Sequence, residues 1–230
     1  MAKMDPRIQP GSLQVQEQAE LRINEIFFSI QGESTRVGLP TIFIRLTGCP
    51  LRCRYCDTAY AFHDGEKMSI ESIIQSISQY RAKHVTVTGG EPLAQRTCHE
   101  LLSRLCDEGF RVSLETSGAI NLEKVDERVM KIMDIKTPGS TEEDKNKFEN
   151  INYLNLQDQI KFVICNRADY DWSKRKLIEY NLTDICEVLF SPEHESLNPT
   201  ELADWILEDK LNVRLQLQIH KYLWGNIKGK

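Results

Sequence analysis

Residues 84–115 read HVTVTGGEPLAQRTCHELLSRLCDEGFRVSLE, and this stretch decides the fold. It begins with a β-branched run, His84–Thr88, and ends with a second strand-like run, Phe110–Glu115. Between them, Leu93–Asp107 carries leucines three and four residues apart, which is the spacing of a helix with one buried face. Gly109 is a typical residue to end such a helix. A strand, a helix and a second strand in this order predict a βα unit with parallel strands.

The same alternation extends along the rest of the chain. Ser69–Tyr80 has isoleucines at helical spacing behind a serine, a residue type that caps helices. Pro199–Lys210 opens on proline, which suits the first turn of a helix. No repeat or linker interrupts the pattern, so we expect one domain over residues 21–230, preceded by a flexible leader over residues 1–20. The remaining strand-like runs are Asn24–Ile30, Thr41–Leu46, Val129–Ile135, Gln159–Ile164, Glu187–Phe190 and Val213–Ile219.

The composition restricts the class of protein. Hydrophobic residues make up 40% and charged residues 27% of the 230 residues, which is ordinary for a globular chain. Lys and Arg number 29 against 34 for Asp and Glu, and a net charge of −5 argues against a broad nucleic-acid-binding surface. The longest apolar run is too short to span a membrane, and residues 1–20 hold no signal-peptide core. We therefore expect a cytoplasmic protein with no nucleic-acid or membrane partner.

Three of the seven cysteines, Cys49, Cys53 and Cys56, lie within eight residues. In the reducing cytoplasm such a cluster indicates metal binding before it indicates disulfides. One interpretation is a zinc site completed by His63 as the fourth ligand. The other is a 4Fe–4S cluster with three cysteine ligands and one open iron, which can bind a small molecule directly.

The loops that follow the expected strands share a character. Besides the cysteine loop, they are Gly89–Pro92, Thr116–Gly118, Lys136–Gly139 and Ser191–His194, each with glycine or proline and with polar groups. In parallel β/α folds the carboxyl ends of the strands meet on one rim, where the chemistry is placed. We therefore expect the functional site on that rim.

The three-cysteine loop, followed after the next strand by Gly-Gly-Glu-Pro, resembles the radical S-adenosylmethionine (SAM) superfamily. Within it, an ordered set of motifs resembles the 7-carboxy-7-deazaguanine synthase family of queuosine biosynthesis, from about Leu21 to His220. The motifs that carry this resemblance are Ile23–Ser34, Arg45–Cys49, Cys56–Thr58, Val87–Pro92 and Glu115–Gly118.

The resemblance implies a fold and a reaction. The fold would be a partial parallel (β/α)6-type barrel with about six core strands, possibly with reduced helices. The reaction would convert 6-carboxy-5,6,7,8-tetrahydropterin to 7-carboxy-7-deazaguanine with release of ammonia. The enzyme would be a lyase that uses a 4Fe–4S cluster, SAM and Mg²⁺. Its expected partners are a flavodoxin-like or other low-potential reductant and a second copy of the chain in a homodimer.

The resemblance also implies site residues, none of them a side-chain acid or base, since a 5′-deoxyadenosyl radical performs the chemistry. The cluster would be bound by Cys49, Cys53 and Cys56, and Mg²⁺ by Thr58. SAM would contact Tyr55, Cys56, Asp57, Gly90, Glu115, Ser117, Lys136, Thr137 and Pro138. The pterin would contact Ile30, Gln31, Gly32, Glu33, Arg45, Thr88 and His220.

For several of these positions an ordinary structural role is the alternative. The Thr58 hydroxyl can satisfy a nearby backbone group, and Ser117 can cap a helix. Tyr55 can be a packed loop aromatic, Lys136 a solvated turn residue and His220 a surface residue.

Three other functions fit parts of the sequence. An activase that installs a glycyl radical would show an open face for a partner protein and no pterin binding. A zinc-stapled binding protein would contain zinc in place of iron and sulfide. An electron-transfer protein would normally bring four cysteines to each cluster, whereas three lie together here.

Overall fold

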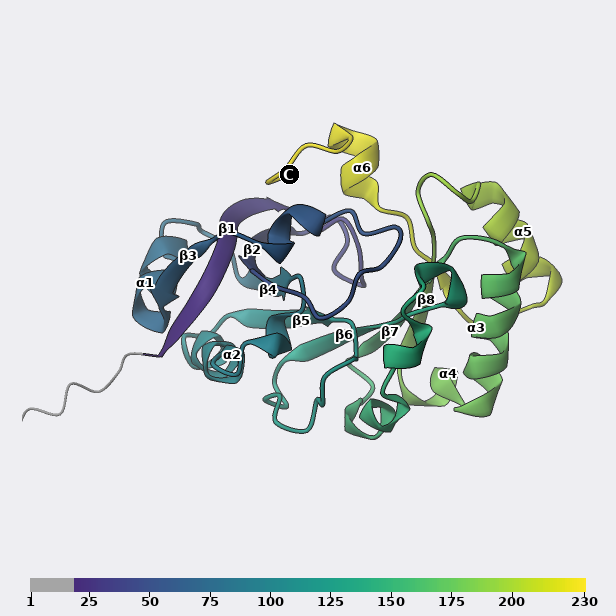
Figure 1. The fold of residues 1–230 in the computed structure, drawn as a ribbon, viewed down its shortest axis with the longest axis horizontal. Helices are drawn as coiled ribbons and strands as arrows, with labels where there is room; N and C mark the ends of the chain where they lie inside the picture. Colours follow the sequence, from purple (N-terminus) through teal and green to yellow (C-terminus); the bar gives the residue numbers. More distant parts are fainter. Residues whose placement is uncertain (1–18) are drawn as a thin grey trace, which may run out of the picture.

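The computed structural model describes residues 19–230, in which nine strands form one sheet with the order β3-β1-β2-β4-β5-β6-β7-β8-β9. The chain thus builds the sheet almost in sequence order (Figure 1). The strands are β1 (Glu20–Ile30), β2 (Pro40–Leu46), β3 (Glu66–Ser69), β4 (His84–Gly89), β5 (Arg111–Thr116), β6 (Met130–Ile135), β7 (Gln159–Ile164), β8 (Glu187–Pro192) and β9 (Arg214–Leu215).

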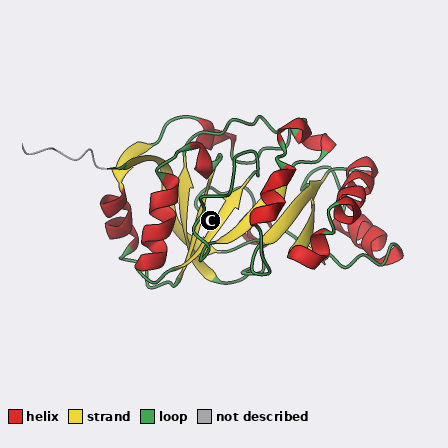
Figure 2. Ribbon diagram, turned by 90° about the horizontal axis from the view of Figure 1, so that it is seen from below, coloured by secondary structure: helices red, strands yellow, loops and turns green. Residues whose placement is uncertain are grey.

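Helices flank the strands (Figure 2). Figure 1 shows α1 and α2 on the half of the sheet that holds β3 to β5, and α3, α4 and α5 beside β7 and β8. The last helix, α6, lies over β1 and β2, away from the other helices. The helices are α1 (Ile70–Ile77), α2 (Cys98–Asp107), α3 (Arg167–Glu179), α4 (Leu182–Ile185), α5 (Pro199–Glu208) and α6 (Ile219–Trp224).

The expected partial parallel barrel is confirmed. The six neighbouring strands β2, β4, β5, β6, β7 and β8 are all parallel, as is the short β9 beyond them. The sheet is an open series from β3 to β9, so the barrel is incomplete. Outside these strands, β1 runs antiparallel to both β2 and β3.

The inner strands are short apolar runs because both of their faces are covered. Val85 and Val87 of β4 and Leu114 of β5 are fully buried, and they share one core cluster with the leucines of α2. The helix expected over Leu93–Asp107 begins later, at Cys98, because the Glu91 carboxylate accepts the Leu93 N–H and holds a 3₁₀ turn ahead of it.

The ends of two other predicted helices follow from their caps. Ser69 caps α1 as predicted, since its hydroxyl accepts the Ser72 N–H at 3.1 Å. The side chain of Asn198 caps α5, which begins at Pro199 as expected. The sequence analysis missed α3, whose mostly polar sequence lacks a clear apolar face. A usable signal was Asn166, whose side chain caps α3 by accepting the Asp169 N–H.

The strand predicted over Val213–Ile219 is wrong for most of its length. Only Arg214 and Leu215 pair with β8, and Ile219 already begins α6. The apolar alternation of this stretch does not reflect burial, because Leu215 and Leu217 are 37% and 43% exposed. The chain leaves the sheet after Leu215, and the Gln218 side chain contacts Glu33 in the loop after β1.

The start of the chain is described only from Ala19. Apart from Ala19 and Glu20, the leader expected over residues 1–20 lies outside the described residues, and Glu20 is the first residue of β1. Across residues 19–230, none of the helices combines the length and the apolar content needed to cross a bilayer.

Candidate active site

A cavity of about 640 Å³ opens at the carboxyl ends of the parallel strands. Loops after β2, β4, β5, β6 and β8 all contribute to its walls, as the sequence predicts. Such a volume is ordinary for a small-molecule site. Of the site residues that the resemblance implies, all line this cavity except Thr137 and Pro138.

The cysteine loop is fastened to the barrel on three sides. The N–H of Gly48 donates to Ala61 O and its carbonyl accepts the Glu91 N–H, both at 2.8 Å. On the far side the Arg54 N–H donates to Ser140 O at 3.0 Å. Leu51 fills the space beneath with 2% exposure. The three thiols are therefore presented from a loop whose backbone is held in place.

The donor set fits an iron–sulfur cube better than a single ion. Cys49, Cys53 and Cys56 carry free thiols and all line the cavity. Within residues 19–230, no three Cys, His, Asp or Glu side chains converge on one point as ligands of a single ion. Three thiols on one loop suit a 4Fe–4S cluster, in which each thiolate binds a different iron. Burial raises the pKa of Cys49 and raises that of Cys53 to about 11, so cluster binding must displace the thiol protons.

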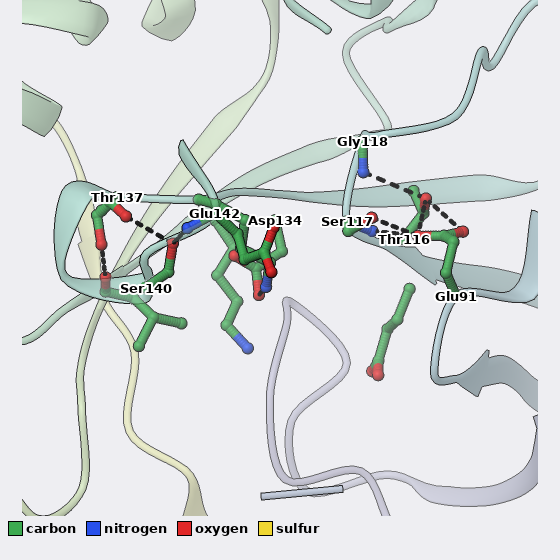
Figure 3. A network of polar contacts seen from close by, with 12 residues as sticks. Glu91, Thr116, Ser117, Gly118, Asp134, Thr137, Ser140 and Glu142 are labelled. Carbon is green, nitrogen blue, oxygen red and sulfur yellow. Dashed lines mark hydrogen bonds and ion pairs between the residues drawn. The ribbon is translucent and has the colours of Figure 1, made fainter. Parts of the chain in front are cut away.

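Glu91 ties the loop after β4 to the loop after β5 (Figure 3). Its carboxylate is completely buried and accepts hydrogen bonds from the Leu93 N–H, the Thr116 hydroxyl, and both the N–H and the hydroxyl of Ser117. The Ser117 contacts are short, at 2.7 and 2.6 Å. Because the Ser117 hydroxyl gives its proton to Glu91, it can only accept a hydrogen bond from a ligand. The expected helix-capping alternative for Ser117 does not apply, since no helix begins at this position.

Gly90 is required by the protein itself. A Cβ on this residue would lie 2.0 Å from Gly48 O and 3.0 Å from the Cys49 Cβ. The glycine that the sequence analysis expected to admit a ligand thus admits the backbone of the cysteine loop. Gly90 and Glu91 together fix that loop against β4.

The loop after β6 folds back on itself (Figure 3). The Ser140 hydroxyl donates to Thr137 O at 2.6 Å and accepts the Glu142 N–H at 3.1 Å. The Thr137 hydroxyl donates to Val163 O on β7, so it faces the strand rather than the cavity. Pro138 opens the 3₁₀ turn that carries this loop. Both residues therefore support the wall from behind.

Lys136 is not the solvated turn residue that was the alternative. It is 9% exposed, and its ammonium pairs with Asp134 at 3.0 Å. Although burial alone lowers the pKa of Lys136, the nearby Asp134 carboxylate raises it above its ordinary value. The cavity wall next to Cys53 therefore carries an ion pair of the Lys136 ammonium and the Asp134 carboxylate.

Glu33, Lys161 and Glu115 form a buried charged group on the opposite wall. The Lys161 ammonium pairs with the Glu33 carboxylate, and Gln218 Nε2 donates to Glu33 Oε1 at 2.6 Å. Burial raises the pKa of Glu33, but the Lys161 charge outweighs it and leaves the pKa below its ordinary value. Burial, and then the Glu33 charge, raises the pKa of Glu115. The pKa values of the two carboxyl groups are thus shifted in opposite directions.

Glu115 lies with residues expected to contact the pterin. The Thr88 hydroxyl donates to Glu115 Oε2 at 2.9 Å, and Gln31 Nε2 donates to Glu115 Oε1 at 3.4 Å. Gln31 also accepts the Glu33 N–H and is only 2% exposed. Its side chain is therefore occupied inside the protein, where it links the Glu33 backbone to the Glu115 carboxylate.

Arg45 has a carboxylate partner already. Its Nε donates to Glu25 Oε1 at 2.7 Å, and the Tyr60 hydroxyl donates to the same oxygen at 2.8 Å. The guanidinium lies over the Phe27 and Tyr60 rings at 5.6 and 5.8 Å. Contacts within residues 19–230 engage only the Nε, so the terminal nitrogens keep a fork that suits a carboxylate.

Thr58 contributes an oxygen next to a carboxylate. Its hydroxyl donates to Asp57 Oδ1 at 2.8 Å. The local hydrogen bond of Thr58 is thus made to a side chain and not to the backbone group that was the alternative. Asp57 Oδ2 also pairs with the Lys221 ammonium at 3.0 Å. Oxygen donors of this kind suit Mg²⁺, with Lys221 as a competitor for the carboxylate.

The segment from Gln218 onward covers the cavity. The Ile219 N–H donates to Gly32 O at 3.1 Å, and a Cβ on Gly32 would lie 2.0 Å from His220 Nδ1. His220 is therefore placed in the cavity and not on the surface. The tail beyond α6 also lines the cavity, and the Lys228 ammonium lies 4.2 Å from the centre of the Tyr60 ring.

The sequence analysis missed several residues of this cavity. Lys161 and Asp134 lie within β7 and β6, outside the motifs that carry the resemblance. Lys221 and the tail carry no motif. A signal was present for the strand residues: a charged side chain inside an apolar β run is rarely buried without a partner or a function.

The comparisons with known proteins agree with this geometry. The family model of the radical SAM superfamily matches residues 43–137. The 7-carboxy-7-deazaguanine synthase of Chlorobaculum tepidum is 44% identical over 211 residues, which cover 90% of this chain and 96% of that protein. The protein of the same name from Koribacter versatilis is 41% identical over 219 residues, with 89% and 97% covered.

The fold has a solved counterpart. The crystal structure of QueE from Escherichia coli superposes with a TM-score of 0.72 at 24% identity, covering 87% of this chain and 94% of that one. A likeness at this identity concerns the fold, and the nearly full-length relatives carry the assignment. The chain belongs to the 7-carboxy-7-deazaguanine synthase family of the radical SAM superfamily.

Proposed function

We propose that this chain converts 6-carboxy-5,6,7,8-tetrahydropterin to 7-carboxy-7-deazaguanine with release of ammonia, as a radical SAM lyase of queuosine biosynthesis. The observation that carries the proposal is the 44% identity to a 7-carboxy-7-deazaguanine synthase over almost the whole of both chains. The cavity supports it, since thiols for a cluster face a wall of carboxylates and guanidinium within one space.

As a radical SAM protein, the chain uses a 4Fe–4S cluster and SAM, which together supply a 5′-deoxyadenosyl radical when bound. Cys49, Cys53 and Cys56 would bind three irons from the fastened loop. The Lys221 ammonium of α6 pairs with Asp57 at the end of this loop, so α6 adds a wall beside the cluster ligands.

SAM would lie between the cysteine loop and the loops after β5 and β6. The backbone of Tyr55, Cys56 and Asp57 would line it on one side. The Lys136 ammonium suits a carboxylate, and the Ser117 oxygen suits an ammonium, because its own proton is given to Glu91. In this arrangement Gly90, Thr137 and Pro138 would act by shaping the loops that contact SAM.

The pterin would occupy the wall formed by β1, β2 and the loop between them. The backbone of Ile30 and Gly32 would face its ring, and the terminal nitrogens of Arg45 would bind its carboxylate. Thr88 and Gln31 would contact the pterin, and both hydrogen-bond Glu115, which the resemblance assigns to SAM. Glu33 and His220 would be further contacts of the pterin.

Mg²⁺ would bind near Thr58, with the substrate carboxylate and water as further oxygen ligands. Its charge would orient the carboxylate next to Arg45. Binding would also compete with Lys221 for the Asp57 side chain. A flavodoxin-like or other low-potential reductant and a homodimeric assembly complete the proposal, on the strength of family resemblance.

The test is an anaerobic assay. The protein is reconstituted with iron and sulfide, and then given dithionite, SAM, Mg²⁺ and 6-carboxytetrahydropterin, with products followed by mass spectrometry. We expect 7-carboxy-7-deazaguanine from the wild type and none from Cys53→Ala. SAM cleavage without pterin conversion would refute the substrate and favour a glycyl-radical activase in its place.

A further inference from the structure

The loop after β1 is fastened to β7 by two matched contacts. The Thr35 N–H donates to Gln159 Oε1 at 3.1 Å, and Gln159 Nε2 donates to Thr35 Oγ1 at 2.7 Å. Two residues before Thr35 and two residues after Gln159, Glu33 pairs with Lys161. Alternate residues of a strand point to the same face, so Gln159 and Lys161 reach the loop from one side of β7. These contacts fix the place of the Glu33 carboxylate.

The Lys161–Glu33 pair is largely shielded from solvent, with side chains 13% and 15% exposed. A buried ion pair is weak support for stability, because well-packed apolar residues often replace it without loss. The pair lines the cavity and not the apolar core. A function at the cavity explains its presence better than a contribution to folding.

Lys161 separates two carboxylates that would otherwise share one buried space. Gln31 links the two residues, since it accepts the Glu33 backbone N–H at 3.1 Å and donates to the Glu115 carboxylate at 3.4 Å. Two like charges at such a site favour protonation of one of them. With the Lys161 ammonium in contact with Glu33, it is Glu33 that stays ionised.

The contacts leave Glu33 free to accept more hydrogen bonds. An ionised carboxylate has about four acceptor positions, two on each oxygen. Among the described residues, Lys161 occupies one position on Oε2 and Gln218 occupies one on Oε1. Each oxygen therefore keeps a position for a ligand. Two parallel acceptors match a ligand edge with two neighbouring N–H groups.

We propose that Lys161 is a positioning residue for substrate recognition. It holds Glu33 as an oriented acceptor for the N–H groups on the 2-amino-4-oxo edge of the pterin, and it thereby sets the preference for a 2-amino over a 2-oxo group. The inference rests on the proposed function and deepens it. Replacing the 2-amino group by oxygen turns a donor into an acceptor, which a fixed carboxylate rejects.

The test compares two ligands that do not react, 6-carboxypterin and its 2-oxo analogue 6-carboxylumazine. Their dissociation constants are measured on the reconstituted holoenzyme by fluorescence titration. We expect the wild type to prefer the pterin by about tenfold or more, the range of one charge-assisted hydrogen bond. Lys161→Met should lose most of this preference, and Lys161→Arg should keep it. Lys174→Met, which removes an ion pair with Asp209 outside the cavity, should behave as the wild type.

A Lys161→Met variant that keeps the wild-type preference would overturn the inference. Should that variant fail to fold, Glu33→Gln and the double variant Glu33→Gln, Lys161→Met decide. Since Lys161 is proposed to act through Glu33, both should show the same reduced preference, and a further loss in the double variant would refute it. Conversion of 6-carboxytetrahydropterin by the wild type separates the two proposals. If the wild type does not convert 6-carboxytetrahydropterin, the proposed function is refuted. If it does, and Lys161→Met still prefers 6-carboxypterin over 6-carboxylumazine as the wild type does, only this inference is refuted.

Discussion

Replacing Glu91 by alanine should destabilise the protein more than most single substitutions. The carboxylate is completely buried and accepts two backbone N–H groups, those of Leu93 at 3.1 Å and Ser117 at 2.7 Å. A buried donor left without a partner costs about 1–3 kcal/mol. The hydroxyls of Thr116 and Ser117 can rotate to other acceptors, whereas the two N–H groups cannot. We therefore expect a loss of about 4 kcal/mol in the free energy of unfolding for Glu91→Ala.

Replacing Glu91 by glutamine should cause a smaller loss of stability than replacing it by alanine. Glu91→Gln keeps one oxygen for Leu93 but turns its NH₂ group toward the Ser117 N–H, so about half of the loss is expected, near 2 kcal/mol. Urea unfolding of the unloaded chain measures both. With a urea dependence of about 3 kcal/mol per M, the alanine variant should shift the midpoint by about 1 M.

Glu108→Ala is the matched control. Glu108 pairs with Arg104 at 3.3 Å on the surface of α2, where both side chains are more than 40% exposed. An exposed pair is worth about 0–1 kcal/mol, so the midpoint should barely move. A loss below about 1 kcal/mol for Glu91→Ala, or equal losses for alanine and glutamine, would refute the reasoning about buried donors.

Three further outcomes are expected. Gly90→Ala should lower iron and sulfide bound per chain after reconstitution, because its Cβ would lie 2.0 Å from Gly48 O; full cluster content would contradict the assigned packing. Hydrogen bonds from Arg128 hold the pKa of Asp126 well below its ordinary value. Asp126 therefore stabilises the fold at pH values above its unfolded pKa of about 3.9. This contribution is lost as the pH falls through the lower pKa of the folded state. The stability difference between the wild type and Asp126→Asn should therefore be present at neutral pH and shrink in acid, and a constant difference in urea titrations would exclude this. Tyr170→Phe should lower the free energy of unfolding by about 1–2 kcal/mol, because the buried hydroxyl contacts Asp209 Oδ2 at 2.7 Å and Trp205 O at 2.8 Å; an unchanged thermal midpoint would show that these bonds contribute nothing.

The sequence predicts the parallel strands well because their signal is local. His84–Thr88 and Gln159–Ile164 are short apolar runs between turn residues, and the structure confirms them within a residue or two. The shared rim follows from topology alone, since parallel strands place their following loops together. The same local signal fails for Val213–Ile219, where the alternation is present but no neighbouring strand extends the sheet.

The pairings inside the cavity could not be predicted from local patterns. Lys161 meets Glu33 across 128 residues of sequence, and Lys221 meets Asp57 from a helix with no motif. Neither periodicity nor spacing carries information about such distant partners. The role of Gly90 shows a different limit. The need for a glycine was evident, but whether a ligand or the chain's own backbone approaches it depends on the folded loop.

The placement of residues 218–230 over the cavity has a practical and a temporal consequence. These residues follow every described strand in the sequence, so the wall that holds Glu33 and Asp57 is completed only after those strands have been synthesised. The same placement puts any affinity tag fused to Lys230 at the mouth of the cavity. A tag at the other end of the chain, before the first strand, is the better choice for measuring what this protein binds.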